Sequence, residues 1–380
     1  MASSSVSRTR WRHIDTGPLE DLPRSFFRET NLPMSFEPQV SESQGYAIWT
    51  HPSLNLKGVR AFGLLASATP GKMSEDAPPL FGLAFNQEMV RVIASVFDGM
   101  GGAGSKLIPL NEKYSVTNAY LASRLGRQVL EELVWSQDYL LDVPPGVVAE
   151  ILSQEFLAMS GELPDKGESR IRGKADKTLP TTIATVMCDK SGPNTWRVRA
   201  QWAGDSRAYL LTPTLGLQQI TSDDVEESDP MIQLGADHKL NNVVSASEPF
   251  KINERIIEVN SHSLLLVATD GLFHYLPTPG TLEFILLDAM KTSETETAKS
   301  LGGLSRLISQ DDVSLVVVAL GFDQFSEIPL AFRRRKALLE SLGYESLLAM
   351  NPGEEATVSL ALKIWRAERE SYMGIIENYG

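Results

Sequence analysis

The stretch from Val96 to Gly102 reads VFDGMGG, and it decides the fold. The apolar run VIA (residues 92–94) leads into it, which predicts a buried strand that ends at the carboxylate of Asp98. The glycines that follow predict a tight turn whose main-chain oxygens a ligand can approach, as Mg2+ or Mn2+ requires. On its own, this pattern is also compatible with a phosphate-binding loop or a plain turn.

Other acidic residues share this position at the margin of an apolar segment: Glu75, Asp76, Asp270, Asp311 and Asp312. The apolar run LLLVAT (residues 264–269) precedes one of them, and the run VSLVVVAL (residues 313–320) follows two. A carboxylate without a partner in such a place is costly, and converging carboxylates repel one another. A pair of divalent cations that neutralises them is the simplest explanation, so the sequence predicts a metal site.

Five short motifs occur in the order seen in a known family. They are ED (75–76), DGMGG (98–102), GDSR (204–207), ATDGL (268–272) and DDVS (311–314). In this order and spacing the chain resembles the metal-dependent Ser/Thr protein phosphatases of type 2C over roughly residues 60 to 322. Met100 resembles the bacterial branch, because many eukaryotic members carry His there.

The resemblance implies a site with two Mg2+ or Mn2+ ions. It assigns the catalytic roles to Asp98, Asp270 and Asp311, with Asp98 bridging both ions. The carbonyl of Gly99 and the pair Glu75 and Asp76 would serve one ion, and Asp270 and Asp311 the other. A water activated between the ions would then hydrolyse phosphoserine or phosphothreonine. Asp176 lies near the position where many relatives hold a third, weakly bound metal.

Two departures from the family pattern leave a second function open. Gly71 stands where the family has a phosphate-binding arginine, and Lys72, one place further on, is the candidate for that charge. Asp312 replaces the usual Asn. The alternative is therefore a catalytically weak module of this fold that acts as a regulatory or sensory binding protein. A nucleotide-binding loop is discounted, because the glycine-rich turn lacks the lysine of a Walker motif.

The fold expected from the pattern and the resemblance is α+β, a four-layer α-β-β-α sandwich of two antiparallel sheets flanked by helices. Thr117 and Pro145 open two amphipathic helices that would cover one sheet. The segments 181–188 and 196–203 predict a hairpin, whose second strand turns Arg199 and Gln201 toward a solvated face.

Three regions are expected along the chain. Residues 1–45 predict a disordered tail, residues 46–322 the catalytic domain, and residues 323–380 a C-terminal helical extension. The last helix of this extension would carry an apolar stripe of Val358, Ala361, Leu362, Trp365 and Tyr372. Residues 221–245 match the mobile flap beside the active site of bacterial relatives, and an ordinary surface loop is the alternative interpretation.

Composition and net charge argue against several classes of partner and several kinds of site. The net charge of the 380 residues is -13, which argues against nucleic acid or an anionic membrane as the main partner. Cys188 is the only cysteine, so an internal disulfide and a cysteine-based zinc site are excluded. No apolar run of about 18 residues occurs, which predicts no membrane span. The expected partners are phosphorylated proteins and a cognate Ser/Thr kinase, in cytoplasmic signalling.

Overall fold

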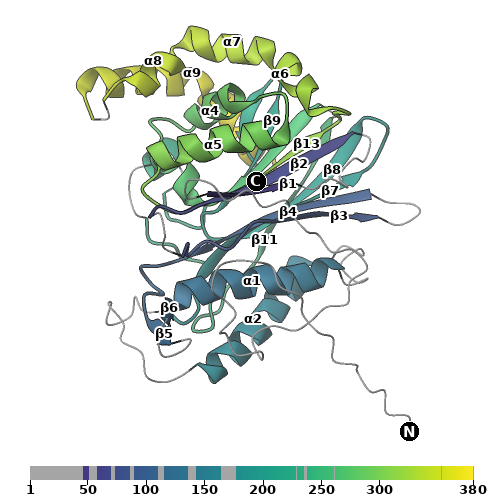
Figure 1. Cartoon of the computed structure of the whole chain (residues 1–380), viewed down its shortest axis with the longest axis vertical. Coiled ribbons are helices and arrows are strands. Elements are labelled where there is room, and N and C mark those ends of the chain that lie inside the picture. The colour runs from purple at the N-terminus through teal and green to yellow at the C-terminus, as the bar shows by residue number, and fades with distance from the viewer. Residues whose placement is uncertain are drawn as a thin grey trace.

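A computed structural model of the chain describes residues 46–50, 58–69, 73–85, 90–109, 115–135, 143–163, 177–227, 229–234, 238–260, 262–351 and 353–379. The tail predicted over residues 1–45 lies outside these ranges. Figure 1 shows two sheets stacked face to face, with helices on the outer face of each.

The first sheet has six strands in the order β1-β2-β13-β12-β9-β10, and every neighbouring pair is antiparallel. Its strands are β1 (Tyr46–Thr50), β2 (Val59–Ala66), β9 (Arg207–Thr212), β10 (Gly216–Gln219), β12 (Ser263–Ala268) and β13 (Val313–Leu320). The apolar runs before Asp270 and after Asp312 thus become the two central strands, β12 and β13. Both are buried along their whole length, because both faces of the sheet are covered.

The second sheet has five strands in the order β11-β8-β7-β4-β3, again antiparallel throughout. Its strands are β3 (Leu80–Phe85), β4 (Val90–Gly99), β7 (Thr181–Lys190), β8 (Thr195–Ala203) and β11 (Asn253–Asn260). The strand expected before Asp98 is therefore β4, and the expected hairpin is β7 with β8. A short ribbon of β5 (Leu107–Pro109) and β6 (Ser115–Thr117) follows the glycine-rich turn.

Helices cover the two outer faces (Figure 1). On the five-stranded sheet, α1 (Asn118–Trp135) packs on β4 and β7, and α2 (Pro145–Glu162) packs on α1. On the six-stranded sheet, α5 (Glu294–Ile308) packs on β1 and β2, and α4 (Thr281–Ala289) packs on α5. The described residues thus form the four layers α-β-β-α, which confirms the predicted α+β fold class.

The remaining helices are short except for the last. They are α3 (Pro230–Gln233), η5 (Asp270–Leu272), η6 (Phe325–Glu327), α6 (Ile328–Ala331), α7 (Arg333–Leu342), α8 (Tyr344–Ala349) and α9 (Glu355–Tyr379). The long helix α9 packs against the edge strand β10. No helix in the described part of the chain is both long and apolar enough to cross a membrane.

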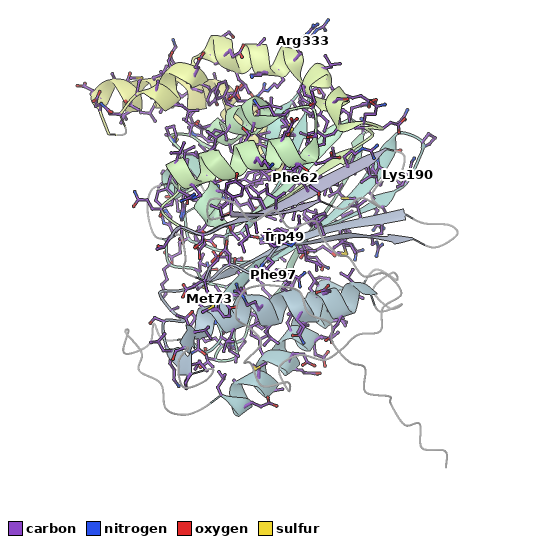
Figure 2. All side chains as sticks on the ribbon, in the orientation of Figure 1. Trp49, Phe62, Met73, Phe97, Lys190 and Arg333 are labelled. Atoms are coloured by element: carbon purple, nitrogen blue, oxygen red, sulfur yellow. The ribbon has the colours of Figure 1, made fainter. Side chains whose placement is uncertain are left out.

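Three apolar layers fill the spaces between these elements, and the alternation along β4 shows how. Val96 points between the two sheets, whereas its neighbour Phe97 points toward α1. Phe62 on β2 lies in the third layer, under α4 and α5 (Figure 2). That third layer also contains Trp365 and Tyr372 of α9, so the C-terminal helices share a core with the six-stranded sheet.

Two of the patterns expected from the sequence differ in the structure. Arg199 and Gln201 on β8 are only 9% and 3% exposed, and both side chains donate to the carbonyl of Val143. On α9, Val358 and Leu362 are exposed rather than part of the buried stripe. The buried face of that helix consists of Ala361, Ile364, Trp365, Tyr372, Met373 and Ile375.

Candidate metal centre

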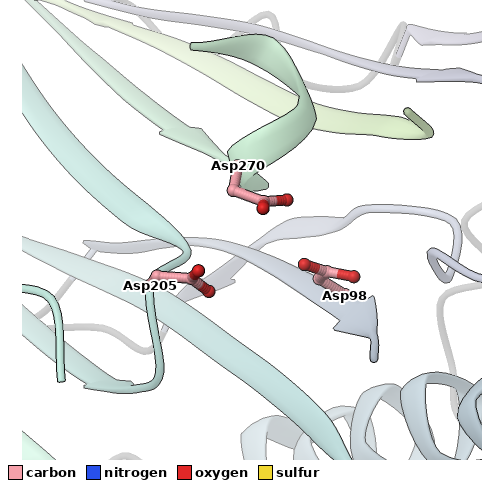
Figure 3. A group of neighbouring side chains, drawn as sticks. All are labelled: Asp98, Asp205 and Asp270. Carbon is pink, nitrogen blue, oxygen red and sulfur yellow. The ribbon is translucent and has the colours of Figure 1, made fainter. Parts of the chain in front are cut away.

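Three aspartates from different strand ends meet at one end of the sandwich. Asp98 is the last residue but one of β4, Asp270 follows β12, and Asp205 lies in the turn between β8 and β9. One carboxylate oxygen from each lies within 4.8 Å of the others, and Figure 3 shows the three side chains converging from the two sheets. Such a group of carboxylate oxygens is a suitable ligand set for a hard divalent cation.

Backbone pairing fixes where each of these residues lies. Asp98 is paired with Thr182 in the β4 and β7 ladder, and its carbonyl accepts a hydrogen bond of 2.6 Å from the Thr181 hydroxyl. Asp205 follows Gly204, whose φ of +99° is a left-handed conformation that favours glycine. The turn therefore brings the Asp205 side chain to the same end of the sandwich as Asp98.

The electrostatics of the cluster show that it is short of positive charge. Burial, and then the neighbouring carboxylates, raise the pKa of Asp76, Asp98 and Asp205 well above the ordinary value. The same two causes raise the pKa of Asp311 to about 6. These groups disfavour their own ionisation unless a cation accompanies them. The Asp205 Oδ1 atom is also buried without a hydrogen-bond partner among the described residues.

Asp270 differs because it has a basic neighbour. His274 Nδ1 lies 3.2 Å from Asp270 Oδ2, one turn further along the chain. Burial raises the pKa of Asp270, but the hydrogen bond and the charge of His274, together with hydrogen bonds from Asp98 and the Gly271 backbone, outweigh it, so that this pKa is lowered. Burial lowers the pKa of His274, and the contact with Asp270 outweighs it and raises that pKa. Asp270 is therefore the member of the cluster that is most readily ionised.

Asp76 and Glu75 are held beside the cluster by hydroxyl groups. Asp76 is 2% exposed, and its Oδ2 accepts a hydrogen bond of 2.8 Å from the hydroxyl of Thr269. Glu75 Oε1 accepts one of 2.6 Å from Thr117, which also caps the start of α1. The Glu75 carbonyl accepts another, of 2.6 Å, from Ser123 of that helix. Helix α1 and its cap residue Thr117 therefore hold both the side-chain carboxylate and the main-chain carbonyl of Glu75.

The loop that carries Glu75 is also tied to the strand end at Asp312. Asp312 Oδ1 accepts from the amide of Ala68 at 2.8 Å, and its Oδ2 accepts from the amide of Glu75 at 2.7 Å. The amide of Asp312 in turn donates to Asp311 Oδ1 at 2.8 Å. Asp312 thus uses one oxygen to hold the amide of Glu75 and the other to hold the amide of Ala68, which requires two acceptor atoms.

The other residues predicted from the sequence divide into two groups. Gly99 is the last residue of β4, paired with Thr181, so its carbonyl lies at the same strand end as Asp98. Lys72 and Asp176 lie outside the described residues. The roles of all these residues, as metal ligands or phosphate contacts, stay predictions.

Two residues of the site were not predicted. Asp205 lies within the GDSR motif but is not among the ligands that the resemblance implies, and His274 lies outside all five motifs. The available signal for His274 is its spacing four residues after Asp270 in a segment that turns. For Asp205, the pairing of β9 with β12 was needed, because it places the residue beside Asp270.

No protein-family model and no curated protein sequence matches the chain. Several solved structures match it. The serine/threonine phosphatase Stp1 from Staphylococcus aureus is 18% identical, with 70% of this chain and 95% of that chain covered and a TM-score of 0.48. The serine/threonine phosphatase PstP from Mycobacterium tuberculosis is 19% identical, with 70% and 100% covered and a TM-score of 0.47. The S. agalactiae serine/threonine phosphatase is 14% identical, with 69% and 99% covered and a TM-score of 0.47. These are bacterial phosphatases, the class of protein that the sequence motifs resemble.

Proposed function

We propose that this chain is a metal-dependent protein phosphatase that hydrolyses phosphoserine and phosphothreonine with Mn2+ or Mg2+. One observation carries the proposal, namely the convergence of Asp98, Asp205 and Asp270 within 4.8 Å at one end of the sandwich. A group of half-buried carboxylates in which the pKa of two members, Asp98 and Asp205, is raised is destabilising in itself, so its presence is best explained by a bound cation.

The residues that would hold two ions all lie at this end of the sandwich. They are Glu75, Asp76, Asp98, Asp205, Asp270, Asp311 and the carbonyl of Gly99. Divalent cations bound there would neutralise phosphoryl oxygens and lower the pKa of water toward neutrality. A third, weaker ion at Asp176 and a phosphate contact from Lys72 belong to the same proposal.

The surrounding residues of the chain orient these carboxylates. Thr269 directs Asp76, Thr117 directs Glu75, and His274 directs Asp270 through contacts of 2.8, 2.6 and 3.2 Å. Such supporting contacts fix the orientation of a metal ligand and raise its affinity. The site is thus held by two sheets and by α1 rather than by one loop.

Phosphorylated proteins would be the substrates, and a Ser/Thr kinase in the same cytoplasm would generate them. The second candidate function is a catalytically weak module that binds metal and acts as a regulatory or sensory protein. The observation that favours it is Gly71, which stands where the resembled family has its phosphate-binding arginine.

The test is hydrolysis of a phosphothreonine peptide by the full chain with Mn2+, with Mg2+ and with EDTA. We expect turnover with either metal and none with EDTA. The variant Asp98→Asn should lower kcat/KM by more than about 100-fold, the upper end of what loss of a mere supporting residue costs. Asp288→Asn on α4 is the matched control, because it removes the same charge at a side chain that is 54% exposed.

Metal binding measured by calorimetry separates the two functions. Mn2+ binding that Asp98→Asn abolishes, together with no turnover in the wild type, would replace the phosphatase by the sensory protein. Equal turnover in Asp98→Asn and Asp288→Asn would refute the assignment of the site itself.

A further inference from the structure

A buried chain of hydrogen bonds leads from the C-terminal helix toward the metal centre. Tyr372 on α9 is 2% exposed, and its hydroxyl donates to Gln219 Oε1 at 3.0 Å. The same amide group donates from Nε2 to Asp223 Oδ1 at 3.2 Å. Gln219 is 1% exposed, so neither end of its amide can turn to bulk water instead.

The chain continues from Asp223 to Arg207. The Asp223 carboxylate accepts from Arg207 Nε at 2.9 Å and from Nη2 at 2.7 Å, the two-pronged geometry of a strong ion pair. Arg207 is fully buried, and its guanidinium lies 4.1 Å from the ring centre of Phe273. Phe273 is the neighbour of His274, which contacts Asp270.

This ion pair also fixes the turn that carries Asp205. Arg207 is the second residue after Asp205, and the residue next to Asp223 secures the other side of the turn. Asp224 Oδ2 accepts from the amide of Gly204 at 2.9 Å, and the Asp224 amide donates to the Gly204 carbonyl at 3.0 Å. Asp223 and Asp224 therefore hold the turn from both sides.

From these contacts we propose that Tyr372 is a positioning residue for the metal centre. By accepting the Tyr372 hydroxyl, Gln219 keeps its Nε2 toward Asp223. Asp223 in turn holds the Arg207 guanidinium in place. Arg207 then fixes the position of the turn that carries Asp205 and of the Phe273 ring. The inference rests on the proposed function only in that Asp205 is taken to bind the metal. It gives the C-terminal helix, which lies beyond the region of resemblance, a role in the site.

A second contact extends this role to the segment predicted to be a flap. Arg207 Nη2 donates to Gln233 Oε1 at 2.9 Å, and Arg369 of α9 lies 3.9 Å from Asp229. Both partners belong to the described part of residues 221–245. Loss of the Tyr372 hydroxyl should therefore loosen the backbone near Asp223 as well as the turn at Asp205.

The test compares two hydroxyl deletions on α9 in the full chain. Tyr372→Phe removes the hydroxyl that enters the buried chain. Ser371→Ala removes a hydroxyl that, within the described part of the chain, bonds to the carbonyl of Leu215 and not to the buried chain of hydrogen bonds. We expect Tyr372→Phe to weaken Mn2+ binding about 10-fold by calorimetry, the lower limit for a residue that supports metal ligands. It should also speed amide hydrogen exchange in residues 203–210 and 221–227, whereas Ser371→Ala should change neither.

A third variant tests the ion pair between Arg207 and Asp223 itself. Asp223→Asn breaks the ion pair directly and should weaken Mn2+ binding about 10- to 100-fold. Wild-type Mn2+ affinity in Tyr372→Phe, or equal losses in Tyr372→Phe and Ser371→Ala, would overturn the proposal. Metal affinity and hydrogen exchange do not require turnover. If the protein proves not to be a phosphatase, both measurements still decide the role of Tyr372.

Discussion

At the scale of single residues, Asp312 bears on whether the site is built for catalysis. The resembled family has Asn there, and the substitution could signal a degenerate site. In the structure, however, the two carboxylate oxygens accept from two different amides, those of Ala68 and Glu75. An Asn would offer one acceptor oxygen and turn its NH2 group toward the second amide donor, so that one of these two hydrogen bonds would be lost. Asp312 is thus a functional replacement that fixes Glu75.

The glycines after Asp98 allow a sharper prediction about Glu75. A Cβ on Gly101 would lie 1.8 Å from Glu75 Oε2, whereas a Cβ on Gly102 would have no described atom within 4 Å. Because the atom in conflict is the end of a flexible side chain, Gly101→Ala should displace the Glu75 carboxylate rather than unfold the protein. We expect weaker Mn2+ binding in calorimetry with little change in Tm.

The neighbouring variant Gly102→Ala provides the control for this prediction. It carries the same added methyl group in the same turn and should bind Mn2+ as the wild type does. If both variants bind equally, Glu75 has no part in metal binding.

The candidate site could be predicted from the sequence only in part. Asp98 and Asp270 were identified because each directly follows an apolar strand, a local signal. Asp205 required knowledge that β9 pairs with β12, a contact between segments about 60 residues apart that no local pattern encodes. The order of the five motifs supplied the fold, because each motif marks the end of one strand or turn.

At the scale of elements, two adjacent glycines in α5 allow the effect of close packing on stability to be measured separately from the effect of helix propensity. A Cβ on Gly302 would lie 2.9 Å from the ring of Tyr46 on β1, and a Cβ on Gly303 would have no described atom within 4 Å. Helix α5 therefore approaches β1 closely at Gly302 and not at Gly303. We expect Gly302→Ala to lower the free energy of unfolding by about 1–3 kcal/mol through overpacking.

The paired variant Gly303→Ala should have the opposite sign. It gains helix propensity without a clash and should raise the free energy of unfolding by up to about 1 kcal/mol. Urea unfolding of both variants measures the difference. Equal stabilisation in both would show that α5 does not contact β1 as described.

The elements that differed from expectation show what a periodic pattern omits. Alternation along β8 correctly placed Arg199 and Gln201 on the face opposite the inter-sheet core. It could not reveal that the segment before α2 covers this face, where the Val143 carbonyl accepts from both side chains. On α9, the buried face is rotated relative to the predicted apolar stripe, because a helix with apolar residues on several sides does not specify which side packs.

At the scale of the whole molecule, the predicted domain boundary at residue 322 can be tested. Residues on both sides of it share one core layer, for example Phe62 and Leu266 with Phe332, Trp365 and Tyr372. Arg335 also bonds to Glu283 of α4 at 2.6 Å in a buried pair. We expect a chain truncated after Phe322 to be insoluble or to lose several kcal/mol of stability, because it exposes an apolar face and leaves Glu283 without its Arg335 partner.

The control for the truncation is a chain that ends after Tyr379 and lacks only the final glycine. It should unfold as the full chain does. A soluble truncated chain with the Tm of the full chain would show that residues 1–322 fold independently of the C-terminal extension.

The cost of the acidic cluster should appear in the stability of the whole molecule. Burial and the charges of Asp270, Asp76 and Asp205 all disfavour the ionised form of Asp98, so the metal-free protein bears this repulsion. Asp98→Asn replaces this carboxyl group with a neutral amide, which carries no cost of ionisation or of proton uptake, and should leave the metal-free Tm equal to that of the wild type or higher. Mn2+ at about 100 times its Kd should stabilise the wild type by about 2.7 kcal/mol and should not stabilise the variant. Thermal unfolding with and without Mn2+ measures both effects.

A metal-free Asp98→Asn protein that is less stable than the wild type, with an undiminished Mn2+ shift, would mean that Asp98 is a structural residue and that the cation binds elsewhere. The opposite pattern would mean that the fold tolerates an unfavourable cluster because function requires the charge.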